Sequence, residues 1–232
     1  MLKKVLEIFK KVGIDHFYGD FFDSRFYISH LLSKMQLKNI LDVGCGAGVL
    51  LEAAPNCFKV GTDLSFESIK QAKKLNPGIE YIQSDAQYLP FKNKTFSTIT
   101  AMHLFPVIDI HGGNWKLSIG EVKRISNDCS TIFITGANRT SRHFKKTHKI
   151  DDRKKYLKHI DQVKEFEDEF VVTLEGWGSH SRYIMFPFKI IYKIPDILNE
   201  KLGIEKLLYK ISKSKKYLKD GRSYIIICKS KK

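Results

Sequence analysis

Apolar and polar positions along most of the chain alternate between two periods, one typical of strands and one typical of helices. Short apolar runs predict strands at 39–43, 58–62, 80–83, 96–102 and 131–135. Helical spacing between these runs predicts helices at 49–54, 66–75 and 115–125. Because strands that alternate with helices form a parallel sheet covered on both faces, the pattern predicts a doubly wound α/β fold.

The pattern changes toward the carboxyl end of the chain. Two further apolar runs, 170–174 and 224–228, are separated by a stretch too long for a hairpin loop, so we expect an insert with its own structure. Helices are also predicted at 17–36 and 151–165. We therefore expect a single domain in four parts: an N-terminal helical cover (1–37), a core (38–179), a lid-like insert (180–221), and a last strand with a basic tail (222–232).

Composition narrows the class of protein. A chain of 232 residues, 43% of them hydrophobic, is large and apolar enough for one packed domain, so extensive disorder is not expected. Its four scattered cysteines have neither paired nor metal-ligand spacing, which favours a reducing compartment and predicts no metal site. With no evident signal peptide and no membrane-spanning run, we expect a cytoplasmic protein.

The charge of the chain is unevenly distributed. The formal net charge is +15, with 17 basic against 13 acidic residues in 1–140 and 23 against 12 in 141–232. A basic half is typical of contact with nucleic acid, a membrane surface or a phosphorylated substrate. The lysines are interspersed with acids and apolar residues, however, so a plain solvated surface is slightly favoured.

A glycine-rich turn carries the strongest functional signal. The first predicted strand contains Asp42, and a helix begins after three closely spaced glycines, Gly44, Gly46 and Gly48. Such a turn brings the backbone close to a nucleotide-like ligand, and amides at the helix start can face a carboxylate. Val49 stands where a dinucleotide-binding fingerprint needs its third glycine, so a dinucleotide is disfavoured.

Polar residues also follow the next two predicted strands, and the carboxyl ends of parallel strands meet at one edge of a sheet. Asp63 is placed to accept hydrogen bonds from both ribose hydroxyls, and Asp85 from the exocyclic amine of adenine. Cys45 is expected to fill space rather than act as a nucleophile. The candidate cofactor-binding residues are Asp42, Gly44, Cys45, Gly46, Gly48, Asp63, Leu64, Ser65, Ser84, Asp85, Ala86 and Met102.

Residues 39–135 resemble the core of the class I S-adenosylmethionine-dependent methyltransferases, in the small-molecule branch that includes ubiquinone and menaquinone biosynthesis. The matching segments are Ile40–Leu50, Val60–Asp63, Gln83–Phe91 and Phe96–Phe105. The resemblance implies a Rossmann-like, seven-stranded, mostly parallel sheet with a reversed last strand. It also implies S-adenosylmethionine as cofactor and S-adenosylhomocysteine as product, with an N-terminal helix over the cofactor and Arg25 as a candidate partner for its carboxylate.

The chain departs from the family pattern near the fourth strand. Family members often have an acidic residue directly after the phenylalanine that opens the fourth strand, and this chain has Ser97 there. The histidine that is usual in the following loop of the family has no counterpart at the matching position. His103, at the end of that strand, is the best-placed candidate for a catalytic base, and Asp109 and His111 are expected in the same loop. A structural role for His103, lining the pocket or contacting the cofactor, is the alternative that we favour.

The leading hypothesis is a methyltransferase that methylates a small-molecule acceptor at oxygen. Transfer from a sulfonium centre is an in-line displacement, so alignment and the exclusion of water are the main demands on the protein. One alternative is an RNA methyltransferase that holds phosphates with its basic half. Another is a membrane-surface enzyme for a lipid-linked or quinone-like substrate, and a third is a cofactor-binding module without catalysis.

Overall fold

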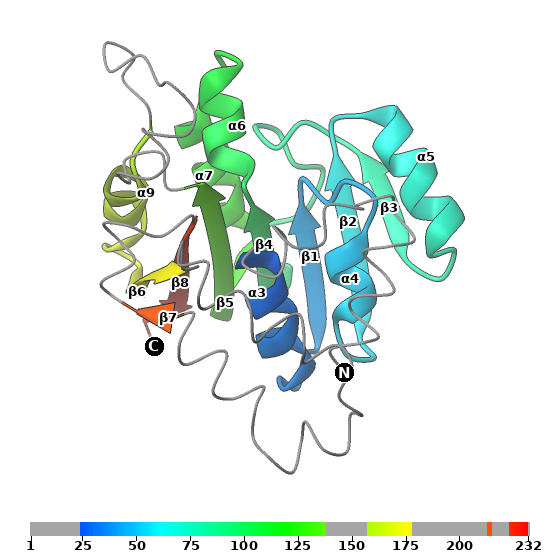
Figure 1. The fold of residues 1–232 in the computed structure, drawn as a ribbon, viewed down its shortest axis with the longest axis horizontal. Helices are drawn as coiled ribbons and strands as arrows, with labels where there is room; N and C mark the ends of the chain where they lie inside the picture. The colour runs from blue at the N-terminus through cyan, green and yellow to red at the C-terminus, as the bar shows by residue number, and fades with distance from the viewer. Residues whose placement is uncertain (1–23, 138–156, 178–212, 215–222, 232) are drawn as a thin grey trace, which may run out of the picture.

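The computed structural model describes four parts of the chain, residues 24–137, 157–177, 213–214 and 223–231. The predicted N-terminal cover before residue 24, the start of the predicted helix at 151–165 and nearly all of the 180–221 insert lie outside the described residues. In the described part, one mixed sheet is flanked by helices (Figure 1). No helix of this part is both long and apolar enough to cross a membrane.

Strands and helices alternate in the first half of the fold, as predicted. The helices are α3 (Ser24–Ser33), α4 (Val49–Ala53) and α5 (Phe66–Leu75), and the strands are β1 (Asn39–Val43), β2 (Phe58–Asp63), β3 (Glu80–Gln83) and β4 (Phe96–Met102). The bounds of β1, β3, β4 and α5 agree with the prediction residue for residue. The Ser65 side chain caps α5 by accepting a hydrogen bond from the Ser68 N–H at 3.2 Å, as a short hydroxyl residue does at a helix start.

The second half holds longer strands than predicted. Its elements are α6 (Leu104–Ile110), α7 (Trp115–Ile125), β5 (Ser126–Ala137), α9 (His159–Phe166), β6 (Phe170–Trp177), β7 (Lys213–Ser214) and β8 (Ser223–Ser230). The strand predicted at 131–135 extends at both ends, to Ser126 and Ala137. Its polar first residues follow α7 without a turn. Ser126 pairs with Phe96 of β4, and regular pairing with β4 resumes at Thr131.

Helix α6 corrects one expectation. Asp109 was expected in a loop but lies within α6, and His111 is the residue that ends this helix. The proline of the sequence Leu-Phe-Pro at its start does not break the helix, because Pro106 stands in the first turn, where no intrahelical N–H is needed. Phe105 and Ile108 then face the core, which fixes the helix against the sheet.

The strand order is β3-β2-β1-β4-β5-β8-β6-β7. Strands β3, β2, β1, β4 and β5 are parallel to one another, whereas β8 is antiparallel to both of its neighbours, β5 and β6. The predicted seven-stranded sheet with a reversed last strand is therefore confirmed. The two-residue strand β7 pairs with the end of β6 and adds an eighth strand at the edge.

Both faces of the sheet are buried, which explains the near-continuous apolar runs of the strands. In β1, Leu41 and Val43 join a core cluster with α6, α7 and α9, whereas Ile40 faces the opposite cluster with α3, α4 and α5. The same two-residue alternation holds in β8, where Ile226 and Ile225 face opposite clusters. The loops at the carboxyl ends of the parallel strands are thus held from both sides.

Candidate functional site

The glycine turn after β1 is built largely from backbone hydrogen bonds to β2. The N–H groups of Gly44 and Cys45 both donate to the Thr62 carbonyl, at 2.8 and 2.9 Å, and the Gly48 N–H donates to the Cys45 carbonyl at 2.9 Å. The three glycines have φ values of 73°, 51° and 77°, a region that favours glycine. The amides of these residues are therefore already engaged, and the turn offers a ligand open space rather than those donors.

Two glycines of this turn have different surroundings. A Cβ at Gly48 would overlap the hydroxyl and ring of Tyr81, which is buried beneath the turn, whereas a Cβ at Gly46 would meet nothing within 4 Å. Tyr81 thus leaves no room for a side chain at position 48. Gly46 marks a place where the backbone faces free space, as a close approach to a ligand requires.

The Asp63 carboxylate ties the glycine turn to the end of β2. Its Oδ2 accepts from the Gly46 N–H and its Oδ1 from the Ser65 N–H, both at 2.9 Å. Since each carboxylate oxygen has two acceptor positions, one position remains on each oxygen. A pair of neighbouring hydroxyls, as in a ribose, fits this remaining capacity.

Asp42 has a structural partner that the sequence did not indicate. Its side chain is 2% exposed, and its Oδ1 accepts from the Thr100 hydroxyl of the neighbouring strand at 2.6 Å. The contact joins β1 to β4 directly beneath the turn. No spacing rule relates residues 58 positions apart, so only the strand order reveals it.

Cys45 behaves as the sequence predicts for a space-filling residue. The thiol is buried, and burial, followed by the negative charges of Asp42 and Asp63, raises its pKa well above the usual range. A thiol held in its protonated form is a poor nucleophile.

The turn after β3 presents a second carboxylate. The Asp85 Oδ1 accepts from the Gln87 N–H at 2.8 Å, and the Gln87 Nε2 lies 3.3 and 3.2 Å from the two carboxylate oxygens. The Ser84 N–H donates to the Asp63 carbonyl at 3.1 Å, which places the turns after β2 and β3 side by side. The Ser84 Oγ is buried and meets no hydrogen-bonding partner within the described residues.

Side chains of α7 hold the segment that follows Asp85. The Glu121 carboxylate accepts from the Leu89 N–H at 2.7 Å and pairs with Arg124, whose guanidinium donates to the carbonyls of Leu89 and Phe91 at 3.0 and 2.7 Å. The Arg124 hydrogen bond lowers the pKa of Glu121. This pair fixes a loop that has no regular structure of its own.

The end of β4 carries the candidate base. Met102 lies in the last position of β4, and the His103 N–H donates to the Thr135 carbonyl of β5 at 2.9 Å. His103 has a φ of 60°, uncommon for a residue with a side chain, and it starts α6. Non-glycine residues in this region are enriched at functional sites.

Leu64 belongs to the same edge of the sheet, whereas Ser97 lies at the opposite end of the strands. Leu64 is exposed between Asp63 and Ser65, and its carbonyl accepts from the Gln83 Nε2 at 3.0 Å. Arg25 lies in α3, but its side chain is outside the described residues. Ser97, at the departure from the family pattern, donates to Asn39 at the opposite end of the strands.

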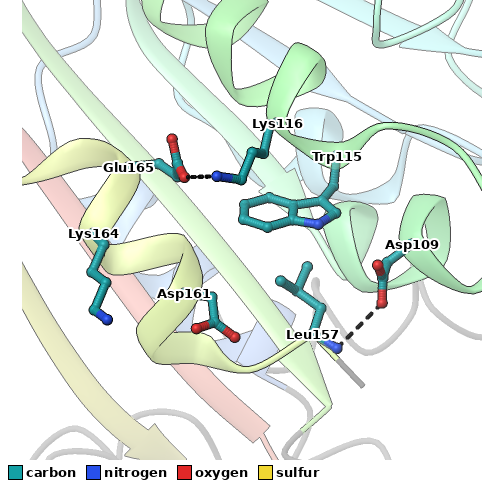
Figure 2. A pocket seen from close by; sticks show the side chains of 7 residues that line it. All are labelled: Asp109, Trp115, Lys116, Leu157, Asp161, Lys164 and Glu165. Carbon is teal, nitrogen blue, oxygen red and sulfur yellow. Dashed lines mark hydrogen bonds and ion pairs between the residues drawn. The ribbon is translucent and has the colours of Figure 1, made fainter. Parts of the chain in front are cut away.

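A separate pocket of about 350 Å³ lies between α6, α7 and α9 (Figure 2). Its lining includes the Trp115 indole and an ion pair between Lys116 and Glu165 of 2.8 Å. Asp109 lines it too, and its carboxylate accepts from the Leu157 N–H at 3.2 Å. Asp109 thus anchors the chain before α9. In the described part of the chain, no three acidic, histidine or cysteine side chains lie close enough to hold a metal.

Comparisons with known proteins identify the domain and its fold. Residues 40–126 match the family model described as a methyltransferase domain. Over 97% of this chain and 99% of the other, the structure superposes with a TM-score of 0.62 and 11% identity on a SAM-dependent methyltransferase from Thermotoga maritima. A SAM-dependent methyltransferase from Archaeoglobus fulgidus has a TM-score of 0.59 and 20% identity over 89% of this chain and 94% of that one. The fold is that of a class I methyltransferase.

Curated relatives match the same domain. A protein of Methanocaldococcus jannaschii, itself uncharacterised, is 37% identical over 43% of this chain and 37% of its own length. A fatty-acid O-methyltransferase of Mycolicibacterium smegmatis is 33% identical over 32% and 30% of the two chains. A tRNA (carboxymethyluridine(34)-5-O)-methyltransferase of Saccharomyces cerevisiae is 39% identical over 24% and 20%. The chain therefore matches between 20% and 37% of the length of these relatives.

The matches bear out the predicted methyltransferase fold, and the two solved neighbours are described as SAM-dependent. The narrower resemblance to ubiquinone and menaquinone enzymes stays a prediction. The candidate residues from Asp42 to Ala86, with Met102 and His103, lie at one edge of the sheet, at or just after the ends of β1, β2, β3 and β4.

Proposed function

We propose that the chain is a class I methyltransferase that binds S-adenosylmethionine at the carboxyl edge of β1–β4 and methylates a small-molecule acceptor at oxygen. The observation that carries the proposal is that two carboxylates, those of Asp63 and Asp85, lie on neighbouring turns beside the open backbone of Gly46. Acceptor oxygens at these places match the donors of an adenosine: two ribose hydroxyls and one exocyclic amine.

The residues at this edge fit the cofactor in three further respects. The buried Ser84 Oγ lacks a partner among the described residues and offers a donor and an acceptor. Free space over Gly46 leaves room for a ligand. Asp63 and Asp85 also add negative charge at a site for a cationic sulfonium compound. When bound, S-adenosylmethionine supplies an activated methyl group, so what remains for the protein is to position the acceptor and exclude water.

His103 is the residue we propose to accept the proton of a hydroxyl acceptor. It lies where β4 ends and α6 begins, and its φ of 60° is a strained conformation retained at this edge of the sheet. General-base catalysis contributes about 10²–10⁴-fold. Replacement of His103 by Asn, which also tolerates this backbone region, therefore lowers kcat by about that factor, while cofactor affinity is retained.

Support for an oxygen acceptor comes from two relatives. By their names, the fatty-acid enzyme and the tRNA enzyme both transfer a methyl group to oxygen, although their acceptors belong to different classes. The apolar residues Val107 and Ile110 of α6, each nearly half exposed, follow His103 and suit an apolar small molecule better than a phosphate backbone.

A panel assay tests the activity. Purified protein is incubated with S-adenosylmethionine carrying a deuterated methyl group and with fatty acids, phenols, amines or bulk tRNA, and S-adenosylhomocysteine and labelled products are measured by mass spectrometry. The proposal predicts labelled methyl esters or ethers from the small acceptors. Products labelled only at nitrogen, or no turnover with any acceptor despite cofactor binding, contradict it.

An RNA acceptor is the second candidate, favoured by the tRNA relative and by the basic residues concentrated in 141–232. Salt dependence separates the two, because phosphate contacts make affinity fall steeply with salt whereas a neutral acceptor shows little change. A KM that rises tenfold or more between about 50 and 200 mM salt identifies the RNA enzyme. A membrane-surface role for the 180–221 insert and a cytoplasmic location stay predictions.

A further inference from the structure

Gln87 stands beside one of the two proposed cofactor carboxylates and was not singled out by its sequence context. Its side-chain nitrogen lies 3.3 and 3.2 Å from the two oxygens of Asp85, and its own N–H donates to the Asp85 Oδ1 at 2.8 Å. Both oxygens of the carboxylate are thus in contact with one neighbouring residue. Rotation of the carboxylate breaks at least one of these contacts.

The orientation of the Gln87 amide is determined by its surroundings. Its oxygen accepts from the Asn114 N–H at 2.8 Å, and its nitrogen faces the Asp85 carboxylate. An amide turned the other way sets its oxygen against a carboxylate and its nitrogen against a backbone N–H, which loses both interactions. Gln87 is therefore held as a donor toward Asp85.

The support for Gln87 extends into α7. The Asn114 side chain caps this helix by accepting from the Lys116 and Leu117 N–H groups, at 3.1 and 3.4 Å, so its own N–H lies at a fixed helix start. The start of α7 therefore holds the Gln87 amide, and the Gln87 amide in turn contacts the Asp85 carboxylate. By contrast, the Asp63 carboxylate is oriented by backbone N–H groups alone among the contacts described for it.

We propose that Gln87 is a positioning residue that sets the preference for adenine by holding the Asp85 carboxylate in one orientation for the exocyclic amine. The inference rests on the proposed function, in which Asp85 accepts from that amine. With Gln87 present, the amide takes part of the acceptor capacity of Asp85 and leaves Oδ2 with a free position for one further donor. A ligand with a carbonyl in place of the amine meets a carboxylate that cannot turn away.

The test compares two ligands by calorimetric titration, S-adenosylhomocysteine and S-inosylhomocysteine, in which a carbonyl replaces the amine. The wild-type protein is expected to prefer the adenine compound by about tenfold or more, the scale of one hydrogen bond to a charged group. Gln87→Met, which is close in size and has no amide, is expected to reduce this preference to about threefold or less. Gln87→Ala serves as a second variant if the methionine variant is not folded.

Two control variants separate positioning from a general structural role. Gln83→Met removes a glutamine amide at the same edge, one that donates to the Leu64 carbonyl and not to Asp85, and is expected to keep the wild-type preference. Asn114→Ala removes the cap of α7 but leaves the Asn114 N–H as a partner for Gln87, and is expected to lower thermal stability while keeping the preference.

The outcomes are distinct. If the Gln87 variants bind both ligands more weakly by equal factors, or if Gln83→Met loses the preference to the same extent, Gln87 does not position Asp85 and the inference is overturned. If wild-type protein binds neither ligand, the proposed function itself fails. Loss of preference in the Gln87 variants alone, with both controls unchanged, supports the inference.

Discussion

The turns after β2 and β3 present similar carboxylates held in different ways. Asp63 and Asp85 each accept from the N–H two residues ahead, but Asp63 also accepts from the Gly46 backbone, whereas Asp85 relies on the side chain of Gln87. Beyond Asp85 the loop is held by side chains of α7, mainly Glu121 and Arg124. The turn after β2, with the glycine turn to which Asp63 joins it, is thus fixed by main-chain groups, and the turn after β3 is held by side chains that substitution can remove one at a time.

Gly48→Ala tests the support of the glycine turn after β1, which Asp63 joins to the end of β2, and is expected to have the largest effect. The new Cβ overlaps Tyr81, and the backbone stays in a region unfavourable to alanine, so the free energy of unfolding should fall by about 2–4 kcal/mol. Urea unfolding measures this change. Gly46→Ala is the matched control: it has the same kind of φ but open space around it, and should cost no more than about 1–2 kcal/mol of stability.

Asp63→Ala removes the carboxylate that joins the glycine turn to β2. We expect the free energy of binding S-adenosylhomocysteine to weaken by about 1–3 kcal/mol, the scale of hydrogen bonds to a charged acceptor. Calorimetric titration of the folded variant with S-adenosylhomocysteine measures this change in binding free energy. An unchanged dissociation constant excludes Asp63 from the ribose site.

Asp85→Asn is expected to have a smaller effect on binding than Asp63→Ala, about 1–1.5 kcal/mol, because one donor of the ligand rather than two loses a charged acceptor. Its effect on stability should be slight, since the Gln87 side chain can still contact the amide oxygen. A titration run beside a thermal melt distinguishes the two quantities. A loss of stability as large as that of Gly48→Ala contradicts the expectation that Asp85 contributes less to the stability of the fold than the glycine turn does.

Glu121→Gln tests how α7 holds the second turn and should reduce the free energy of unfolding by about 1 kcal/mol at pH 7. Because Arg124 lowers the pKa of Glu121 from its usual 4.5, the carboxylate stabilises the folded state fully above that value, and its contribution is lost as the pH falls through the lowered pKa. The difference between wild type and variant should therefore be constant above about pH 5.5 and shrink below pH 4.5.

The control for this prediction is the exposed ion pair of Lys94 and Asp128 at 2.8 Å. Its side chains are 64% and 78% accessible, so Asp128→Asn should change stability by less than about 0.5 kcal/mol at any of these pH values. An equal effect of the two substitutions means that Glu121 acts as an ordinary surface charge.

Most of the fold and the glycine turn after β1 could be predicted from the sequence because their determinants are local. Short apolar runs mark β1 and β4, the Ser65 side chain caps α5 within its first turn, and the three glycines act through their own φ angles. These features need no knowledge of which strands are neighbours. Helix α6 was missed because its proline and short length masked the helical spacing of Phe105 and Ile108.

The supports of the site could not be predicted because they join distant residues. Thr100 binds Asp42 across 58 positions and Glu121 binds Leu89 across 32, and both contacts depend on the packing of elements in space. Gln87 shows the division within one residue: its N–H bond to Asp85 follows from a two-residue spacing common in turns, whereas its bond to Asn114 does not.

A crystal structure of the protein with S-adenosylhomocysteine tests the central claim most directly. The account predicts the ribose hydroxyls within hydrogen-bond distance of the Asp63 carboxylate and the exocyclic amine within that distance of the Asp85 carboxylate, above the turn that contains Gly46. A ligand bound elsewhere, or bound here with neither carboxylate in contact, contradicts it.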